Sequence, residues 1–366
     1  MTRGPELSII VPTFNERENA PMLVERLRDV LRQENWEIIF VDDDSTDGTS
    51  DVIRTIAQQD SRVRCVQRIG RRGLSSACIE GLLASSATYL AVMDADLQHD
   101  ESLLPKMLAA MKSEDLDVVV GSRYLEGGSV GDWTDSRLSL SQLATRLSRL
   151  VVKASLSDPM SGFFMIQRRT LNGAVRNMSA IGYKILADLF ASSPQSLRFR
   201  ELPYEFRARR AGVSKLDSGI MWDYIMLLLD KLVGHFVPVR FLSFSLVGGV
   251  GVFVHLAVVS TLFLGFDVSF VASQTVATMV AMVSNFALNN LITYRDRRLR
   301  GWRWVRGLFT FVIACSVGAF ANVGVASYVF VNNREWALAA LAGVMVSVVW
   351  NFAVTAVYTW NKPKVA

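Results

Sequence analysis

The chain has 366 residues, of which 51% are hydrophobic and 20% are charged. Residues 1–235 hold 31 of the 34 acidic residues and 29 of the 39 basic ones, whereas residues 236–366 hold the remaining 3 and 10. This division excludes a wholly soluble protein and a disordered one. The 3 cysteines, Cys65, Cys78 and Cys315, are too far apart to indicate a zinc site or a disulfide framework.

Five short apolar runs in the first half each lead into a polar turn: 7–12, 37–42, 63–67, 89–94 and 117–122. Helical patterns lie between them, and strands that alternate with helices predict an α/β fold with a mostly parallel sheet. Ligands of such sheets bind at the carboxyl ends of the strands. The polar turns are therefore the candidate site.

Three acidic or polar clusters occupy these turns. The first is the run 12–16, and the second contains three consecutive aspartates, Asp42, Asp43 and Asp44. Neighbouring carboxylates repel one another unless something binds them. Asp43 could accept hydrogen bonds from a base or a ribose, whereas Ser45 and Asp47 are better explained as a helix-capping turn.

The third cluster is an Asp-x-Asp motif formed by Asp94 and Asp96. In an extended chain both side chains project to one side. Two carboxylates and the amide oxygen of Gln98 suit Mg²⁺ or Mn²⁺, which bind through few carboxylates together with substrate phosphates. The motif alone is weak, but its position at a strand end favours a metal site.

In the second half, four stretches contain no Asp, Glu, Lys or Arg: 241–266, 268–294, 307–333 and 336–361. Each exceeds the ~20 residues that an α-helix needs to cross a bilayer. Buried helices of a soluble protein are the alternative, which four such stretches in succession disfavour. We therefore predict a domain at 1–217, an amphipathic interfacial connector at 218–238 and a four-helix transmembrane domain at 239–366.

The loops between these stretches differ in charge. The loop between the second and third stretches holds six arginines, and the C-terminal tail holds Lys362 and Lys364. The two opposite loops hold only Asp267, Arg334 and Glu335. Because basic loops remain cytoplasmic, we predict a multi-pass membrane protein whose catalytic domain and two termini are cytoplasmic.

The four stretches also repeat internally. A shift of 66 residues aligns Asn-Phe-Ala at 285–287 with the same triplet at 351–353, and Tyr294 with Trp360. This pattern predicts a duplicated two-helix hairpin. Asn285 and Asn351 are expected to form hydrogen bonds between helices, the usual role of asparagine in a membrane, rather than to bind a lipid head group.

Seven motifs occur in one order: VPTFNE, VDDDSTDGT, GLSSA, VMDADLQH, GSRY, DPMSGFF and RRAGVSKL. As a set they resemble the family 2 glycosyltransferases of GT-A (Rossmann-like) fold, and more narrowly the dolichyl- or polyprenyl-phosphate mannose synthases. The four apolar stretches resemble the GtrA-like membrane domain found in some of these enzymes. Three residues depart from the pattern of the family: Phe14 stands in place of Tyr, Thr46 in place of Pro, and Asp188 in place of Glu. The change at Asp188 bears on which sugar the enzyme binds.

The resemblance implies three sets of site residues. The donor would be bound by Pro12, Phe14, Glu16, Val41, Asp43, Asp94, Ala95, Asp96, Gln98, Lys184, Arg209 and Lys215. The metal, Mg²⁺ or Mn²⁺, would be bound by Asp94, Asp96 and Gln98. The acceptor phosphate would be bound by Arg123, Arg137 and Ser141, and the catalytic residues would be Asp96, Arg123 and Arg137.

The activity that the resemblance implies is an inverting transfer of one mannose from GDP-mannose to a polyprenyl phosphate. The attacking phosphate oxygen is already anionic near neutral pH, so no general base is required. His99 and His255 are accordingly interpreted as structural, and no nucleic-acid partner is expected. Glucose transfer from UDP-glucose remains an alternative. A processive polysaccharide synthase is disfavoured because a QxxRW motif is lacking, and a non-enzymatic lipid transporter would leave the acidic clusters unexplained.

Overall fold

The computed structural model describes residues 4–129, 148, 151–152, 154–179, 182–207, 219–234, 237–333 and 336–360. The chain divides into two compact units, Met1–His235 and Phe236–Ala366. Each unit has its own core, and each is described separately below.

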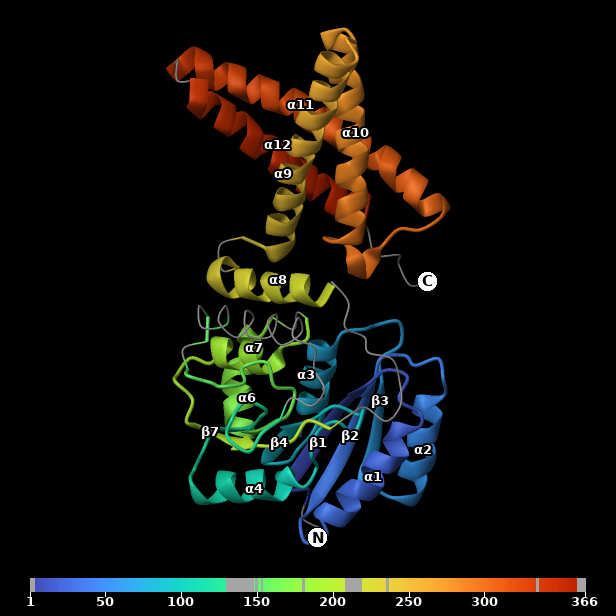
Figure 1. The fold of residues 1–366 in the computed structure, drawn as a ribbon, viewed down its shortest axis with the longest axis vertical. Coiled ribbons are helices and arrows are strands. Elements are labelled where there is room, and N and C mark those ends of the chain that lie inside the picture. Colours follow the sequence, from blue (N-terminus) through green and yellow to red (C-terminus); the bar gives the residue numbers. More distant parts are fainter. Residues whose placement is uncertain are drawn as a thin grey trace. The chain divides into compact units, whose positions relative to one another are not determined.

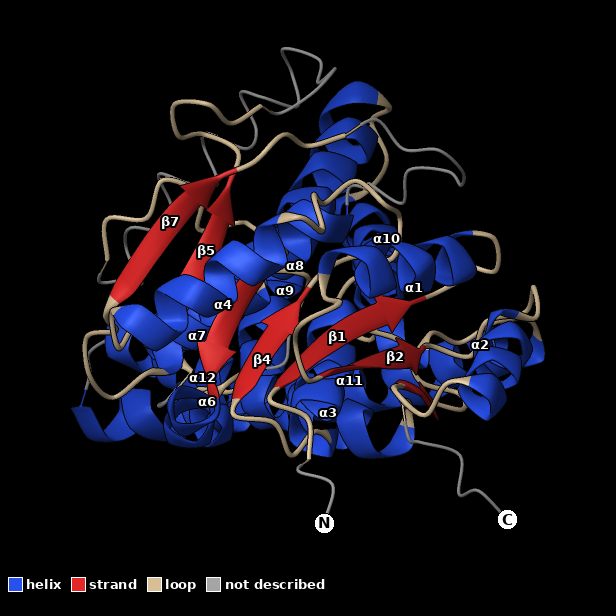
Figure 2. Cartoon of the chain, turned by 90° about the horizontal axis from the view of Figure 1, so that it is seen from below, coloured by secondary structure: helices blue, strands red, loops and turns tan. Residues whose placement is uncertain are grey.

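A mostly parallel sheet forms the centre of the first unit (Figures 1 and 2). Its strands are β1 (Leu7–Thr13), β2 (Trp36–Asp42), β3 (Val63–Gln67), β4 (Tyr89–Val92), β5 (Val118–Ser122), β6 (Phe164–Gln167) and β7 (Phe199–Pro203). Their order in the sheet is β3-β2-β1-β4-β6-β5-β7, and β6 is antiparallel to β4 and β5. The predicted α/β class is confirmed.

Helices cover both faces of this sheet (Figure 2). On one face lie α1 (Asn19–Val30), α2 (Thr49–Gln59) and α4 (Leu103–Ser113). On the other lie α3 (Leu74–Ala84), α6 (Arg168–Ala174, continued by the 3₁₀ turn η1, Val175–Asn177) and α7 (Ile185–Ser192). Side chains alternate along β1, so that Leu7, Ile9 and Val11 join the first core and Ile10 joins the second. Burial of both faces explains why the strands read as nearly continuous apolar runs.

Register brings the polar turns together. Thr13 pairs with Asp42 across β1 and β2, and Ile10 pairs with Val92 across β1 and β4. Beyond these pairs, the Asp43 amide donates to the Thr13 carbonyl at 2.9 Å. The carboxyl ends of β1, β2 and β4 therefore meet at one edge of the sheet, as the parallel topology requires.

A buried ion pair attaches helix α8 (Gly219–Val233) to α7. Lys231 Nζ lies 2.7 Å from Asp188 Oδ1, and the Asp188 side chain is fully buried. The same ammonium donates to the Asn177 carbonyl at 2.8 Å and to Ser192 Oγ at 2.9 Å. Asp188 therefore holds α8 in place.

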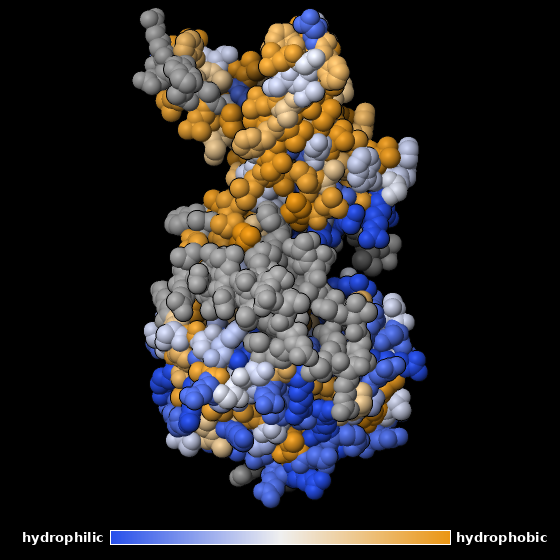
Figure 3. Space-filling model, in the orientation of Figure 1, coloured by the Kyte–Doolittle hydropathy of each residue, from blue (hydrophilic) through white to orange (hydrophobic). Residues whose placement is uncertain are grey.

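Four long helices form the second unit: α9 (Val239–Ser260, continued by the π-helical turn η2, Thr261–Gly265), α10 (Phe270–Leu291), α11 (Trp302–Asn333) and α12 (Trp336–Tyr358). The 3₁₀ turn η3 (Arg295–Arg297) lies between α10 and α11. Within the described residues, four helices are long and apolar enough to cross a membrane, and hydrophobic residues dominate the surface of this unit (Figure 3). The four long apolar helices expected of this half are confirmed.

Equivalent contacts recur in the hairpins α9–α10 and α11–α12. The Asn285 amide lies against Gly251, where an added Cβ would be 2.2 Å from its oxygen, and Asn351 lies against Gly318 at the same distance. Tyr294 and Trp360, which the repeat equates, stack with ring centroids 4.1 Å apart. These contacts support the predicted duplication.

The predicted interhelical hydrogen bonds of the two asparagines are wrong. The amide oxygens of Asn285 and Asn351 are buried and have no hydrogen-bond partner in the described part of the chain. Each amide packs on the glycine of a neighbouring helix, where the backbone groups already bond within that helix.

Removal of the buried ammonium tests the attachment of α8. We expect Lys231→Met to destabilise the first unit by about 3–5 kcal/mol, because the Asp188 carboxylate remains buried without its counter-charge. Lys112→Met is the matched control, because Lys112 is 39% exposed in its pair with Glu6 and should cost at most about 1 kcal/mol. Thermal unfolding of the full chain in detergent measures both, and equal melting temperatures would contradict the assignment.

Candidate active site

At the end of β2, the Asp43 carboxylate is held on both oxygens. Arg68 Nη1 donates to Oδ1 at 2.7 Å, and the Gly73 amide donates to Oδ2 at 2.7 Å. Burial raises the pKa of Asp43, although these two partners oppose the rise. Each carboxylate oxygen has a second lone pair. Asp43 is therefore fixed in orientation and able to accept a further hydrogen bond.

The first and second polar clusters are interlocked. The Asn15 amide donates to Ser45 Oγ at 2.8 Å, and the Glu16 amide donates to Thr49 Oγ1 at 2.9 Å. Buried Pro12 and Val41 pair across β1 and β2 directly below these contacts. The turns after β1 and β2 are therefore joined, with the predicted donor residues Pro12 and Val41 buried beneath them.

The exposed side chain of Arg72 lies over the ring of Phe14, one of the predicted donor-binding residues. The Arg72 guanidinium is 4.1 Å from the centroid of the Phe14 ring. Guanidinium groups stack favourably on aromatic faces. Arg72 extends the surface formed by the first two clusters, and the sequence had given no reason to single it out.

The Asp-x-Asp turn follows β4. Asp96 is 6% exposed and its Oδ1 accepts the Gln98 amide at 3.2 Å, whereas the Asp94 side chain is 37% exposed. Buried Ala95 lies between them. Gln98 Nε2 donates to the Arg207 carbonyl at 2.9 Å, so the amide oxygen is the end left for a ligand.

This set of oxygens fits a divalent metal. Asp94 and Asp96 offer carboxylates and Gln98 an amide oxygen, the hard ligands that Mg²⁺ and Mn²⁺ prefer. Among the described residues there is no group of three or more His, Cys, Asp or Glu side chains that could hold a metal.

His99 lies beneath this turn in an aromatic pocket. Its ring stacks on Phe163 with centroids 5.1 Å apart and contacts Tyr204 and Phe206 edge-on, each at 5.8 Å. Burial lowers the pKa of His99 to about 4, so the imidazole is neutral. Its Nδ1 accepts the Asp94 amide at 3.0 Å. His99 thereby orients the Asp-x-Asp turn, in keeping with the structural role predicted for it.

Arg123 follows β5 and forms a bidentate pair with buried Asp158. Nε and Nη2 of Arg123 donate to the two carboxylate oxygens at 2.7 and 2.8 Å. Burial would lower the pKa of Arg123, but the hydrogen bonds with Asp158 raise it above its ordinary value. Glu201 on β7 accepts from the backbone amides of Ser157 and Asp158 and fixes their loop. The fork of Arg123 is thus locked in one orientation.

The remaining predicted residues fall into two groups. Lys184 directly precedes α7, and the neighbouring Gly182 carbonyl accepts the Ser75 amide at 3.3 Å. That contact places the segment beside the start of α3, next to the Gly73 amide that binds Asp43. Four other predicted residues lie outside the described part of the chain: Arg137, Ser141, Arg209 and Lys215.

The sequence did not predict the ion-pair partners of Asp43 and Arg123, which are Arg68 and Asp158. Asp158 lies in the DPMSGFF motif, which could have signalled a role, but its pairing with Arg123 spans 35 residues. Arg68 is 3% exposed and 25 residues from Asp43, and nothing local marks it.

The sheet order and the acidic turns at the ends of β2 and β4 define a glycosyltransferase of GT-A type. Residues 8–173 match the model of the glycosyl transferase family 2, and residues 243–360 match the transmembrane domain of the GtrA/DPMS family. A dolichol-phosphate mannosyltransferase of Pyrococcus furiosus is 31% identical over 357 residues, which cover 97% of this chain and 99% of that protein. The chain belongs to the dolichol-phosphate mannosyltransferase family and is a multi-pass membrane glycosyltransferase.

Other proteins are similar over part of the chain. A dolichol-phosphate mannosyltransferase of Mycosarcoma maydis is 36% identical over 65% of this chain and 83% of its own. A crystal structure of glucosyl-3-phosphoglycerate synthase from Mycobacterium tuberculosis with Mn²⁺, UDP and phosphoglyceric acid matches with a TM-score of 0.46 and 19% identity, over 62% of this chain and 78% of that one.

Neutralising Asp158 tests the role of the Arg123 pair. In Asp158→Asn the carboxylate charge is lost, the Arg123 fork is no longer fixed, and we expect transfer to fall at least tenfold, a barrier change of about 1.4 kcal/mol. Asp115→Asn is the control, because Asp115 pairs with Arg198 and Arg169 at the surface and its side chain is 65% exposed. Circular dichroism should verify folding first. Wild-type rates in folded Asp158→Asn would refute the role.

Proposed function

We propose that this protein transfers a single mannose, with inversion, from GDP-mannose to the phosphate of a polyprenyl lipid of dolichyl type, in the presence of Mg²⁺ or Mn²⁺. The observation that carries this proposal is the meeting of Asp43, Asp94 and Asp96 at one edge of the sheet, in a chain that also has four membrane helices. Mannose and a polyprenyl phosphate are supported by the similarity to the dolichol-phosphate mannosyltransferases of Pyrococcus furiosus and Mycosarcoma maydis.

The donor would bind along the ends of β1, β2 and β4. Asp43 would accept a hydrogen bond from the nucleoside, and Phe14 would contact the base. Asp94, Asp96 and Gln98 would hold the metal, which when bound neutralises charge on the departing diphosphate. Lys184, Arg209 and Lys215 would add positive charge on the same side. His99 is neutral and occupied by the Asp94 amide, so its role would be to orient the turn.

The acceptor would need no general base. A phosphate monoester carries nearly two negative charges at pH 7, so its oxygen is a ready nucleophile. Arg123, Arg137 and Ser141 would hold this phosphate, and Asp158 would keep the Arg123 fork fixed. Direct attack on the anomeric carbon would invert its configuration, and the rate would depend on positioning and on charge stabilisation.

The proposed orientation puts the first unit and both termini in the cytoplasm. It is supported by exposed arginines of the second unit: Arg295, Arg298 and Arg300 lie between α10 and α11, and Arg303 and Arg306 lie in the first two turns of α11. Clustered positive charge of this kind is retained on the cytoplasmic side.

The deciding experiment compares two donors. Purified full-length protein is incubated with farnesyl phosphate, Mn²⁺ and either labelled GDP-mannose or labelled UDP-glucose, and organic-phase label is counted. We expect label from GDP-mannose only. Label from UDP-glucose alone would replace mannose by glucose in the proposal, and no label from either donor would overturn it.

Removal of one proposed metal ligand gives a second test. We expect Asp96→Ala to lower transfer at least a hundredfold, about 2.7 kcal/mol in barrier, because an oxygen ligand is lost at the reaction centre. Asp51→Ala on α2 is the matched control, because that side chain is 84% exposed. If Asp96→Ala kept more than a tenth of the rate at saturating Mn²⁺, the ligand role would be abandoned.

The proposed acceptor clamp predicts a difference between Arg and Lys. Arginine binds phosphate oxygens through a planar fork that lysine does not reproduce. We therefore expect Arg137→Lys to raise the KM for farnesyl phosphate at least fivefold in detergent and to leave the KM for the donor within about twofold. A normal acceptor KM for Arg137→Lys would show that only a positive charge is needed there.

A further inference from the structure

Asp188, in the first turn of α7, is the centre of a buried polar cluster. Both of its carboxylate oxygens accept the Ser179 amide, at 2.9 and 3.2 Å. Oδ1 also accepts from Ser192 Oγ at 3.0 Å and lies 2.7 Å from Lys231 Nζ. A buried carboxylate is stable only when a counter-charge and hydrogen bonds of this kind offset its loss of water. The Asp188 side chain is therefore held in one position.

The backbone that precedes α7 is tied to Asp188 at two points. The Ser179 amide donates to the carboxylate, and the Asp188 amide donates to the Lys184 carbonyl at 3.1 Å. Gly182, which lies between these points, has a φ of +72°, a left-handed conformation that glycine adopts without strain. One buried residue thus fixes the chain on both sides of this glycine turn.

The same turn contacts the edge of the sheet where the donor would bind. The Gly182 carbonyl accepts the Ser75 amide at 3.3 Å, and two residues before Ser75 the Gly73 amide donates to Asp43 Oδ2 at 2.7 Å. Hydrogen bonds and short runs of backbone therefore connect the carboxylate at the end of β2 with the start of α7. Lys184, the residue directly before α7, lies at the end of this series.

Helix α8, which packs on α7, holds the cluster from its other side (Figure 1). Asp230 accepts the Ser179 hydroxyl, and Lys231 donates to the Asn177 carbonyl at 2.8 Å. Ser179 is thus bound through its amide by α7 and through its hydroxyl by α8. An ion pair that only attached α8 would not require the Ser179 amide, and this contact is what links the cluster to the chain before α7.

We propose that Asp188 is a positioning residue for the sugar donor, with Lys231 as its counter-ion. By fixing the backbone at Ser179 and Lys184, it keeps the Lys184 ammonium directed at the donor diphosphate. The inference rests on the proposed function, which assigns Lys184 to the diphosphate. A cation that is already positioned loses less conformational freedom when the donor binds. The effect therefore belongs to the KM for the donor rather than to kcat.

Two double variants of the full chain separate positioning from stability. Asp188→Asn/Lys231→Met removes both charges but keeps an oxygen that can accept the Ser179 amide, whereas Asp188→Leu/Lys231→Met removes this acceptor as well. Neither variant leaves an unpaired charge in the interior. We expect the leucine variant to raise the KM for GDP-mannose at least about fivefold, the effect of ordering one long side chain. The asparagine variant should resemble the wild type, and neither variant should change the KM for farnesyl phosphate.

Ser179 provides an independent pair of variants if the leucine variant does not fold. Ser179→Pro deletes the amide donor and leaves Asp188 and Lys231 in place. Met178, with a ψ of 136°, already has the extended conformation that a residue before proline requires. Ser179→Ala keeps the amide and removes the hydroxyl that contacts Asp230. We expect the proline variant to raise the KM for GDP-mannose as the leucine variant does, and the alanine variant to resemble the wild type.

Glu37→Leu/Arg64→Met is the control for the loss of an ion pair. Glu37 lies at the amino end of β2, opposite to Asp43, and its side chain is 9% exposed where it pairs with Arg64 at 3.0 Å. This variant should leave the KM for GDP-mannose unchanged. Hydrogen exchange without substrates gives a readout besides activity, because the peptide that contains Ser179 should exchange faster in the leucine variant than in the asparagine variant.

The outcomes distinguish this inference from the proposed function. An absence of mannose transfer by the wild type would overturn the proposed function. If the wild type transfers mannose, an unchanged donor KM in the folded leucine or proline variant would overturn the positioning role alone. Equal donor KM values in the leucine and asparagine variants would overturn it as well, because the two differ in the acceptor for the Ser179 amide.

Discussion

Crowded carboxylates at the carboxyl edge of the sheet are the constraint around which the first unit is arranged. The parallel register of β1, β2 and β4 brings Asp42, Asp43, Asp94 and Asp96 to one edge, where like charges repel. Neighbouring groups offset this repulsion individually. Asp42 accepts from the hydroxyls of Ser45 and Ser50, and Asp43 is paired with buried Arg68.

The same compensation gives the site its rigidity. A buried arginine opposite a carboxylate stabilises the pair only when the geometry is good and the remaining donors are satisfied. Arg68 also donates to the Gly73 carbonyl and to Ser76 Oγ, while its Nε lies 3.5 Å from Glu80 Oε1 without a hydrogen bond in the described part of the chain. Arg123 meets the geometric requirement through the bidentate contact with Asp158. A site held in this way changes little when a ligand binds, so less binding energy is lost to ordering.

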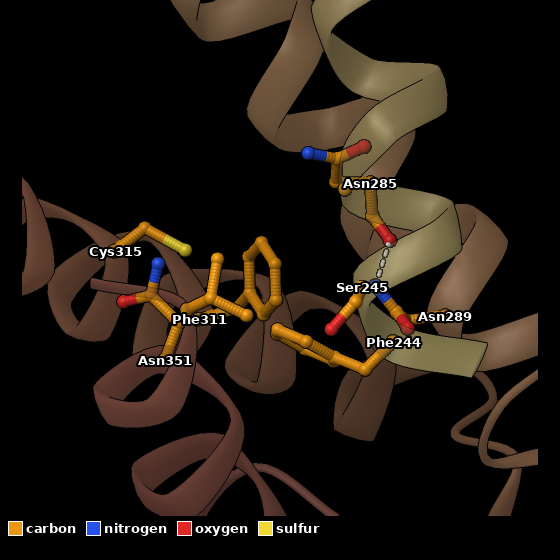
Figure 4. A pocket seen from close by; sticks show the side chains of 9 residues that line it. Phe244, Ser245, Asn285, Asn289, Phe311, Cys315 and Asn351 are labelled. Carbon is orange, nitrogen blue, oxygen red and sulfur yellow. Dashed lines mark hydrogen bonds between the residues drawn. The ribbon is translucent and has the colours of Figure 1, made fainter. Parts of the chain in front are cut away.

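The second unit faces the opposite problem, since its polar groups are few and bulk water is absent. Most of them bond within their own helix or to an adjacent turn, as Asn290 does with the Leu299 amide. Asn290 also accepts the Trp360 indole N–H from the end of the second hairpin. Tyr294, just after α10, stacks on Trp360, just after α12, and this contact joins the ends of the two hairpins. The amide oxygens of Asn285 and Asn351 (Figure 4) are exceptions, since they have no hydrogen-bond partner in the described part of the chain and pack on Gly251 and Gly318.

Local patterns were sufficient to predict the alternation of strands and helices, the Asp-x-Asp turn and the four membrane helices. Each of these depends on residues close together in the chain, whose apolar period or charge is visible in a short window. The placement of the acidic clusters at one edge also followed, because parallel topology leaves a single carboxyl edge.

Tertiary structure alone decided which side chains meet. Arg68 pairs with Asp43 across 25 residues and Arg123 with Asp158 across 35, while Lys231 reaches Asp188 from another helix. A charged residue can pair with any opposite charge that the fold brings near, so spacing in the sequence does not determine its partner. For the same reason the expected bonds of Asn285 and Asn351 were wrong: their partners depended on two glycines in neighbouring helices, whose close approach only the packing of the hairpins reveals.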